Sequence, residues 1–288
     1  MKDRMAYLGP QATFCEKAAL LCIDIDNCEL IPCASIAAVF AAIQLGEANQ
    51  GIVPIENSCE GSLNQTLDLL AYEYDLKISG EIILPIQHNL LVRPGVELDE
   101  IACVLSHPQA LAQCHNYLAA NLGNLERLDT TASTAEAARR VANSPLPWGA
   151  IGTTEAARSY DLAVLSPDIQ DRTNNETRFI TLSTSGDSSG LRMPFPKTSL
   201  LISLDNKPGA LFRVLEQFHL YDINMTKIES RPAKTRIGDY LFFIDIEGHE
   251  LEPRVMKVLE GLKTFVYDLR VLGSYKSYHD SARQNGKY

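Results

Sequence analysis

A strand that ends in a polar cluster and leads into a helix constrains this chain more than any other feature. Residues 52–55 are apolar and mostly β-branched, which predicts a short buried strand. Glu56, Asn57 and Ser58 follow directly, and residues 63–70 repeat apolar side chains with helical spacing. In open α/β sheets, ligands bind beyond the carboxyl ends of strands and against helix N-termini. The stretch therefore predicts an anion-binding corner, with a capped βα turn as the plainer alternative.

The segment before this corner repeats one unit. Strands are expected near residues 4–8 and 29–32, and each is followed by an apolar helical stretch before the chain reaches the strand at 52–55. The order βαβαβα predicts a doubly wound parallel sheet.

Two α/β lobes with a cleft between them are expected over residues 1–185. The first lobe is predicted to hold residues 1–79 and 166–185, and the second to hold residues 80–165, with crossings near 79–82 and 162–170. In the second lobe, strands again alternate with helices.

A separate small domain is predicted over residues 197–276. Residues 183–190, rich in Ser and Gly, predict a flexible linker before it. The elements that follow come in the order βαββαβ, which predicts a ferredoxin-like fold.

Composition limits the classes of function. No apolar run approaches the roughly 20 residues of a transmembrane helix, and the acidic, short-apolar N-terminus is unlike a signal peptide, so the chain is predicted to be cytoplasmic. Residues 1–190 hold 11 Lys and Arg against 24 Asp and Glu. This charge argues against nucleic acid and membrane partners. It also means that an anion site in the lobes must use local donors such as backbone N–H groups, Asn, Ser or Arg.

No cofactor or metal is predicted. The seven cysteines form no C-x-x-C pair, which argues against a zinc site and a disulfide framework. His88 and His107 fit no metal spacing and are interpreted as structural. The glycines form neither a G-x-G-x-x-G motif nor a phosphate-binding P-loop, so a nucleotide is not expected.

A second polar stretch, residues 170–177, enters another apolar segment. Together with the first it resembles the prephenate dehydratases, which remove carboxylate and hydroxide from prephenate to give phenylpyruvate on the route to phenylalanine. The resemblance covers nearly the whole chain. It is carried by Val53–Ser58, Gly61 with Thr66–Leu70, Thr177–Phe179, Gly80–Glu81 with Leu84–Ile86 and His88, Ser106–Gln109, Gln113–Cys114, Tyr7–Pro10 with Thr13–Phe14, and Glu229–Pro232.

The resemblance implies the fold and the activity. The family has two lobes like those of type-II periplasmic solute-binding proteins, and the tail resembles an ACT domain, a small amino-acid sensor. Where the family pattern has Gly and Ser around Thr13-Phe14, this chain has Ala12 and Cys15. These departures weaken the case that this corner contacts the substrate.

Candidate catalytic residues follow from what the reaction needs, which is a grip on two carboxylates and help for the departing hydroxide. The family treats the threonine of the Thr-Arg-Phe motif as catalytic, which implies a hydrogen bond from Thr177 to the leaving oxygen. Arg178 could hold a carboxylate or pair with a neighbouring acid. Glu56 could supply a proton if burial raises its pKa, or could be structural.

Neutral side chains are the candidates for substrate binding. These are Asn57, Ser58, Ser106, Gln113 and Phe179. Ser106 and Gln113 are seven residues apart and are expected on one helical face, with an N-cap and an exposed glutamine as the alternative. Phe179 could stack on the ring or belong to the core.

The tail domain is expected to bind phenylalanine and inhibit the distant cleft. The backbone amides that begin the helix after Pro208 could receive the amino acid's carboxylate. A second subunit should close the pocket, so a homodimer or homotetramer is predicted. The expected effector site comprises Asn206, Pro208, Gly209, Ala210, Leu211, Glu229, Ser230, Arg231 and Pro232.

Two other functions remain open at this point. Arogenate dehydratases run the same elimination on a substrate with an amino group in place of the keto group. A non-catalytic, two-lobed binding protein is the alternative from another class. Since the first dehydratase strand begins near residue 4, no chorismate mutase domain is expected before it, and the chain is predicted to be monofunctional.

Overall fold

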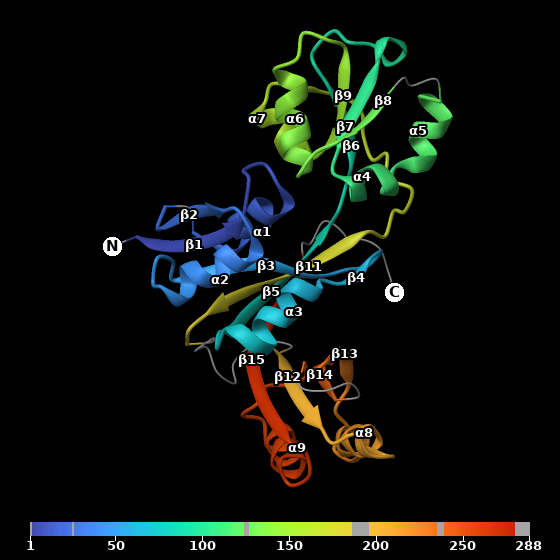
Figure 1. Cartoon of the computed structure of the whole chain (residues 1–288). Helices are drawn as coiled ribbons and strands as arrows, with labels where there is room; N and C mark the ends of the chain where they lie inside the picture. Colours follow the sequence, from blue (N-terminus) through green and yellow to red (C-terminus); the bar gives the residue numbers. More distant parts are fainter. Residues whose placement is uncertain (1, 25, 124–126, 186–195, 235–238, 280–288) are drawn as a thin grey trace.

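Two lobes and a tail domain follow one another in space, with the first lobe in the middle (Figure 1). The structure is a computed structural model. It describes residues 2–24, 26–123, 127–185, 196–234 and 239–279. Residues 186–190 of the predicted linker lie outside the described part. Within the described residues, no helix is long and apolar enough to cross a membrane.

The first lobe is built on a mixed sheet with the strand order β5-β11-β3-β1-β2. Its first elements are β1 (Asp3–Leu8), α1 (Phe14–Cys22), β2 (Cys28–Cys33), α2 (Ile36–Gln44) and β3 (Gln50–Asn57). They are followed by β4 (Gly61–Ser62), α3 (Asn64–Asp68), the π-helix η1 (Leu69–Glu73) and β5 (Lys77–Pro85), and by β11 (Glu176–Ser183).

The predicted parallel order is confirmed for β2, β1 and β3 only. Strand β11 lies between β3 and β5 and runs antiparallel to both. The reason is topological, because β11 re-enters the first lobe from the second. The pattern of residues 1–70 could not reveal this strand, which comes from a distant part of the chain.

The boundary between the lobes differs from the prediction. Strand β5 pairs with β11 from Lys77 to Pro85, so residues 80–85 belong to the first lobe and the chain crosses after Pro85. The buried side chains of Ile78, Ile82 and Leu84 hold the strand there, because they pack into the cores of the first lobe.

The second lobe has a five-stranded sheet in the order β10-β6-β9-β7-β8. Its elements are β6 (Asn89–Val92), the 3-10 helix η2 (Leu98–Glu100), β7 (Cys103–Ser106), α4 (Pro108–Gln113), α5 (His115–Asn121), β8 (Arg127–Thr130), α6 (Thr134–Ala142), β9 (Trp148–Gly152), α7 (Thr154–Ser159) and β10 (Ala163–Ser166). The predicted single helix after Ser106 is broken at Cys114, whose φ and ψ are not helical.

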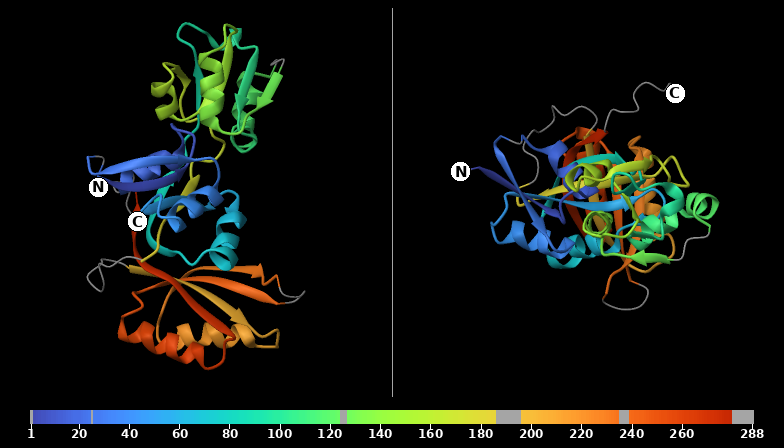
Figure 2. Two further views of the ribbon diagram at one scale, coloured as in Figure 1. Left: turned by 60° about the vertical axis from the view of Figure 1, so that its left-hand side comes forward. Right: turned by 90° about the horizontal axis from the view of Figure 1, so that it is seen from above.

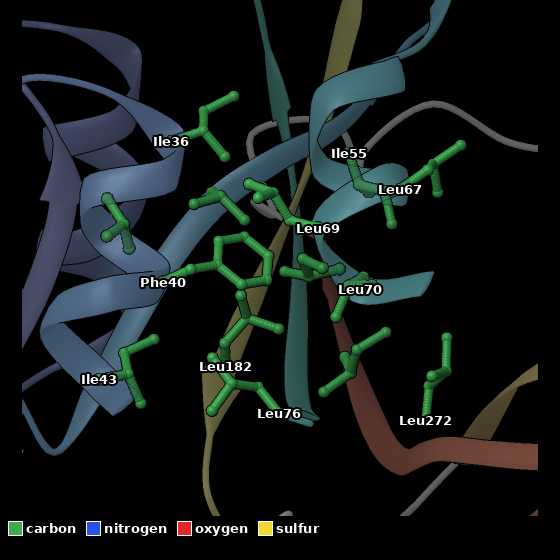
Figure 3. Close-up of a cluster of buried hydrophobic side chains, with 14 of the residues drawn as sticks. Ile36, Phe40, Ile43, Ile55, Leu67, Leu69, Leu70, Leu76, Leu182 and Leu272 are labelled. Atoms are coloured by element: carbon green, nitrogen blue, oxygen red, sulfur yellow. The ribbon is translucent and has the colours of Figure 1, made fainter. Parts of the chain in front are cut away.

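A continuous core joins the first lobe to the tail domain. Phe40 of α2, Leu70 of η1 and Leu182 of β11 belong to one cluster of buried side chains, and Leu272 of the tail lies in the same cluster (Figure 3). The apolar positions of α2 recur with helical spacing and are buried.

The tail domain has the predicted βαββαβ order, so this prediction is confirmed. Its elements are β12 (Pro196–Leu204), α8 (Ala210–Leu220), β13 (Met225–Pro232), β14 (Tyr240–Glu247), α9 (Pro253–Lys263) and β15 (Asp268–His279). Helices α8 and α9 cover the face of its sheet that is turned away from the first lobe (Figure 2). The other face contributes Leu201, Phe243 and Tyr275 to the first-lobe core.

One strand joins the two sheets into a single sheet. Residues 277–279 of β15 pair in parallel with β5. Gly273 allows β15 to approach β5 closely, because a Cβ there would lie 2.1 Å from the carbonyl oxygen of Ile78. The tail domain is therefore docked on the first lobe by strand pairing as well as by its core.

Candidate active site

A cleft of about 450 Å³ lies between the two lobes. Its walls come from the ends of β1 and β3 and the start of β11 in the first lobe, and from the starts of α4 and α6 in the second. The lining residues are Leu8, Thr13, Phe14, Cys15, Pro54, Asn57, Glu60, Gly61, Ser62, Leu63, Ile86, His88, His107, Gln109, Ala110, Gln113, Ala132, Ser133, Thr134, Thr177 and Phe179.

Asn57 is the anchor of the cleft's polar wall. Its Oδ1 accepts hydrogen bonds from the backbone N–H groups of Cys59 (3.0 Å) and Glu60 (3.2 Å), which fixes the orientation of the side-chain amide. Its Nδ2 then donates to Oδ1 of Asn175 at 2.8 Å and to Oγ1 of Thr177 at 2.9 Å. Both the oxygen and the nitrogen of the buried amide are hydrogen-bonded within the protein, so Asn57 orients Asn175 and Thr177.

Thr177 is placed to act as a donor in the cleft. Its side chain is buried, and its Oγ1 accepts the hydrogen bond from Asn57. A hydroxyl carries a single proton and two acceptor sites. Because Asn57 occupies an acceptor site, the proton of Thr177 stays available for a ligand.

A chain of side-chain hydrogen bonds extends this arrangement to the second lobe. Oδ1 of Asn175 accepts the hydrogen bond from Asn57, and Nδ2 of Asn175 donates to Oε1 of Gln113 at 2.8 Å. The same oxygen is 2.9 Å from Nε2 of His88. Nε2 must therefore carry the proton, and Nδ1 is the unprotonated nitrogen of the neutral ring.

His88 is held neutral by its surroundings. It is 3% exposed, its edge meets Phe14, and Nδ1 has no hydrogen-bond partner among the described residues. Burial lowers the pKa of His88, although the bond to Gln113 acts in the opposite direction. The sequence spacing indicates only a structural histidine, whereas the structure places His88 in the cleft wall.

Helix N-termini supply the other donors. Thr13 caps α1 and Ser133 caps α6, and both residues line the cleft from opposite lobes. The first amides of a helix lack intrahelical acceptors and favour anions. Among the described residues that line the cleft, none is a lysine or arginine, and Glu60 is the one acid. A bound anion would thus be held by neutral donors.

Of the two residues that depart from the family pattern, Cys15 lines the cleft and Ala12 packs against the second lobe. Ala12 has a φ of 63°, in the left-handed region that favours glycine. Its carbonyl accepts a hydrogen bond from Thr153 of the second lobe, and its side chain packs in that lobe's core. Contacts with the second lobe hold the alanine in this conformation.

Two predicted substrate-binding serines do not line the cleft. Ser58 is exposed, donates to the carbonyl of Asn174 and accepts from the N–H of Glu176, each at 2.9 Å. Ser106 is fully buried at the end of β7 and donates to the carbonyl of Ile151 at 2.8 Å. Ser106 and Gln113 also share no helical face, because α4 begins only at Pro108.

Strand alternation turns Arg178 and Glu56 away from the cleft, which favours the alternative in which each is paired with an opposite charge. Successive side chains of a strand point to opposite faces, so Thr177 and Phe179 face the cleft while Arg178 faces the tail domain. Glu56 likewise points away from Asn57, toward Lys227 at 2.8 Å. Phe179 is 1% exposed and both lines the cleft and belongs to the core.

The predicted effector residues fall into two groups. Gly209 caps α8 with a φ of 80°, and Asn206 and Pro208 are exposed beside it, with Ala210 and Leu211 following in the first turn. Ser230 is exposed on β13.

The remaining effector candidates contact the first lobe. Glu229 accepts from Ser62 at 3.1 Å, Arg231 donates to Asp68 at 2.8 Å, and the carbonyl of Pro232 accepts from Tyr72. The side chains of Glu229 and Arg231 are therefore used for domain docking.

Comparison with known proteins identifies both parts of the chain. The family model described as "Prephenate dehydratase" matches residues 5–187, and the model described as "ACT domain" matches residues 198–264. A prephenate dehydratase of Methanocaldococcus jannaschii is 40% identical over 286 residues, which are 96% of this chain and 98% of that protein. "Arogenate dehydratase 2" of Petunia hybrida is 41% identical, over 95% of this chain and 72% of that protein.

A solved structure agrees with this assignment. The crystal structure of prephenate dehydratase from Arthrobacter aurescens in complex with L-Phe is 36% identical, with a TM-score of 0.83 over 94% of this chain and 89% of that chain. The chain belongs to the prephenate dehydratase family, with an ACT domain after the two lobes.

Proposed function

We propose that the cleft binds prephenate and that Thr177 assists the departure of its hydroxyl group. The observation that carries this proposal is the hydrogen bond of 2.9 Å from Nδ2 of Asn57 to Oγ1 of Thr177. In this bond the Thr177 hydroxyl accepts from the protein, so its own proton remains free to form a hydrogen bond to the substrate. Thr177 then donates a hydrogen bond to the oxygen of the departing hydroxyl group, on which negative charge develops.

The chemistry needs little more from the protein. The electron pair of the bond to the departing carboxylate moves into the ring, carbon dioxide leaves, and the bond from the ring to the hydroxyl oxygen breaks. The departing hydroxide takes up a proton from solvent, through the Thr177 hydroxyl, and leaves as water. Aromatisation drives the step, so a preorganised donor at the leaving oxygen is the main contribution expected from the site.

The substrate's carboxylates are proposed to lie against the first turns of α1 and α6. These helices approach the cleft from different lobes, and each offers free backbone N–H groups. Binding a dianion between them would draw the lobes together. No metal or nucleotide is proposed.

The test is a steady-state assay with prephenate and with arogenate as separate substrates, each with and without a chelator. Turnover of prephenate that survives the chelator supports the proposal. The Petunia relative makes arogenate a specific second candidate, and a kcat/KM higher for arogenate would select it. Activity that disappears with the chelator and returns with a metal contradicts the cofactor-free mechanism.

Phenylalanine is the proposed effector, bound at the start of α8. The support is the L-Phe complex of the Arthrobacter relative together with Gly209, whose backbone is open because nothing lies within 4 Å of a Cβ placed there. Phe212 is exposed on this helix, and Ile228 is exposed on the edge strand β13. A second subunit is proposed to cover them, giving a homodimer or homotetramer.

Full-length protein is the right material for this test, because β15 pairs with the first lobe. Calorimetric titration with phenylalanine should give heat, light scattering should give at least a dimer, and Gly209→Leu should remove inhibition while leaving kcat unchanged. A wild-type enzyme that is monomeric and unaffected by phenylalanine would rule out the effector site.

A further inference from the structure

Arg178, one residue from Thr177, is the centre of a buried network between the first lobe and the ACT domain. Its Nε donates to Glu81 of β5 at 2.5 Å. Its two terminal nitrogens donate to Asp245 of β14 at 2.6 Å and to the hydroxyl of Tyr275 of β15 at 2.9 Å. All three nitrogens of the guanidinium are therefore bound, two of them to the ACT domain.

The directions of these hydrogen bonds are fixed. Arg178 can only donate and Asp245 can only accept. Ser199 lies 2.5 Å from Oδ1 of Asp245 and 2.6 Å from the hydroxyl of Tyr275. Ser199 therefore donates to Asp245, and Tyr275 accepts from Arg178 and donates to Ser199. The four side chains form one closed ring.

The network is buried and its charges are paired. Arg178, Glu81, Asp245 and Tyr275 are each at most 9% exposed. Burial opposes the charged form of Arg178, but Tyr275, Asp245 and Glu81 raise its pKa well above the usual value. Burial likewise opposes ionisation of Glu81, and Arg178 and Lys197 keep its pKa low. Removing one charged member leaves a buried charge without part of its compensation, which is costly.

Strands β3 and β11 carry Asn57 and Thr177 on their cleft face, and their opposite face is attached to the ACT domain. Thr177 and Asn57 face each other across β11 and β3, and Arg178 and Glu56 occupy the next register position. Arg178 binds Asp245, and Glu56 binds Lys227 of β13 at 2.8 Å. The ACT sheet thus holds the backbone of each strand one residue away from Asn57 or Thr177.

We propose that Arg178 is a positioning residue whose contact with Asp245 sets the place of the Thr177 hydroxyl, so that a change in ACT docking alters turnover. A misplacement of about 1 Å at a reacting group can cost on the order of 10²-fold in rate. The regulatory half of this inference rests on the proposed effector site. The positioning half requires only the dehydratase reaction.

The test is Asp245→Asn in the full-length protein, which keeps the shape of the side chain and removes its charge. Asp268→Asn is the matched control, since it removes one charge from an exposed residue of the same domain. The expected result is a kcat about tenfold lower with KM within twofold for Asp245→Asn, and no change for the control. Inhibition by phenylalanine should be blunted while its calorimetric binding persists.

Hydrogen exchange supplies a readout that needs neither substrate nor effector. Peptides covering residues 174–180 and 56–60 should exchange faster in Asp245→Asn than in the wild type, while the second-lobe strands β7 and β9 stay unchanged. Arg178→Lys keeps the charge and part of the contacts, and its kcat should lie between those of the wild type and Asp245→Asn.

An Asp245→Asn enzyme with wild-type kcat and unchanged exchange at residues 174–180 would overturn the proposal. A parallel rise in KM and fall in kcat, with general loss of protection in both lobes, would reduce Arg178 to a stabilising residue. If only the proposed effector site is wrong, the wild type will not bind phenylalanine, but Asp245→Asn will still lower kcat.

Discussion

The two faces of the β3–β11 pair carry opposite kinds of polar chemistry. On the cleft face, Asn57 and Thr177 are neutral and join an amide chain through Asn175 and Gln113. On the other face, Glu56 and Arg178 are charged and paired with the ACT domain. Residues adjacent in sequence therefore serve different surfaces.

The difference follows from what each face meets. The cleft must accept an anion that comes and goes, and neutral donors leave no unpaired charge in the cleft when the anion is absent. The docking face meets a fixed partner, so its buried charges keep their counter-charges. Buried ion pairs contribute little net stability because desolvation offsets their attraction, but breaking one is costly, which specifies a single docking geometry.

The largest effect is expected on the cleft face, from Thr177→Ala. Loss of the donor at the leaving oxygen should lower kcat by about 10²-fold or more and change KM little. Thr177→Ser keeps the hydroxyl and should retain most of the activity. A folded Thr177→Ala enzyme with near-normal kcat would make the threonine structural.

Asn57→Asp sharpens the same point with an isosteric change. The carboxylate introduced at this position still accepts hydrogen bonds from the N–H groups of Cys59 and Glu60, but it cannot donate one to Thr177. The Thr177 hydroxyl would then donate its hydrogen bond to that carboxylate and no longer to the substrate. We expect kcat to fall by about tenfold or more at neutral pH. Equal kcat in Asn57→Asp and wild type would contradict the assigned direction of the hydrogen bond.

Ser106→Ala should separate stability from activity. The hydroxyl donates to a buried carbonyl outside the cleft, so its loss should lower the free energy of unfolding by about 1 kcal/mol and leave kcat/KM within twofold. Urea unfolding and the steady-state assay on one preparation check both values. A large loss of kcat/KM would return Ser106 to the substrate site.

The smallest effect concerns His88 and pH. Its pKa is lowered in the folded state, so below its ordinary pKa of about 6.5 the unfolded chain binds a proton that the folded chain does not. Stability should fall as the pH drops below about 6.5, and the slope should be weaker in His88→Asn. Identical slopes in wild type and variant would show that His88 is not held neutral by burial.

Part of this site could be predicted from sequence and part could not. Asn57 follows a predicted apolar strand and Thr177 precedes an apolar segment, so the sequence indicates both as candidate site residues. The periodicity of two along a strand also excludes a common face for Thr177 and Arg178, although both belong to the Thr-Arg-Phe motif. His88 and Ser133 could not be assigned to the cleft, because their places depend on the packing of one lobe against the other.

The tail domain shows the same division. Its βαββαβ order follows from local patterns, but the docking of β13 on α3 through Arg231 and Asp68 does not. Arg231 lies in a motif that suggests effector binding, and only the docked structure shows its carboxylate partner in the first lobe.

The most direct test of the contrast between the two faces is a crystal structure of Thr177→Ala with prephenate bound. The account predicts carboxylates within hydrogen-bond distance of the first-turn amides of α1 and α6, with the ring hydroxyl directed at residue 177. A substrate carboxylate bound to Arg178, or to any other lysine or arginine side chain, would contradict it.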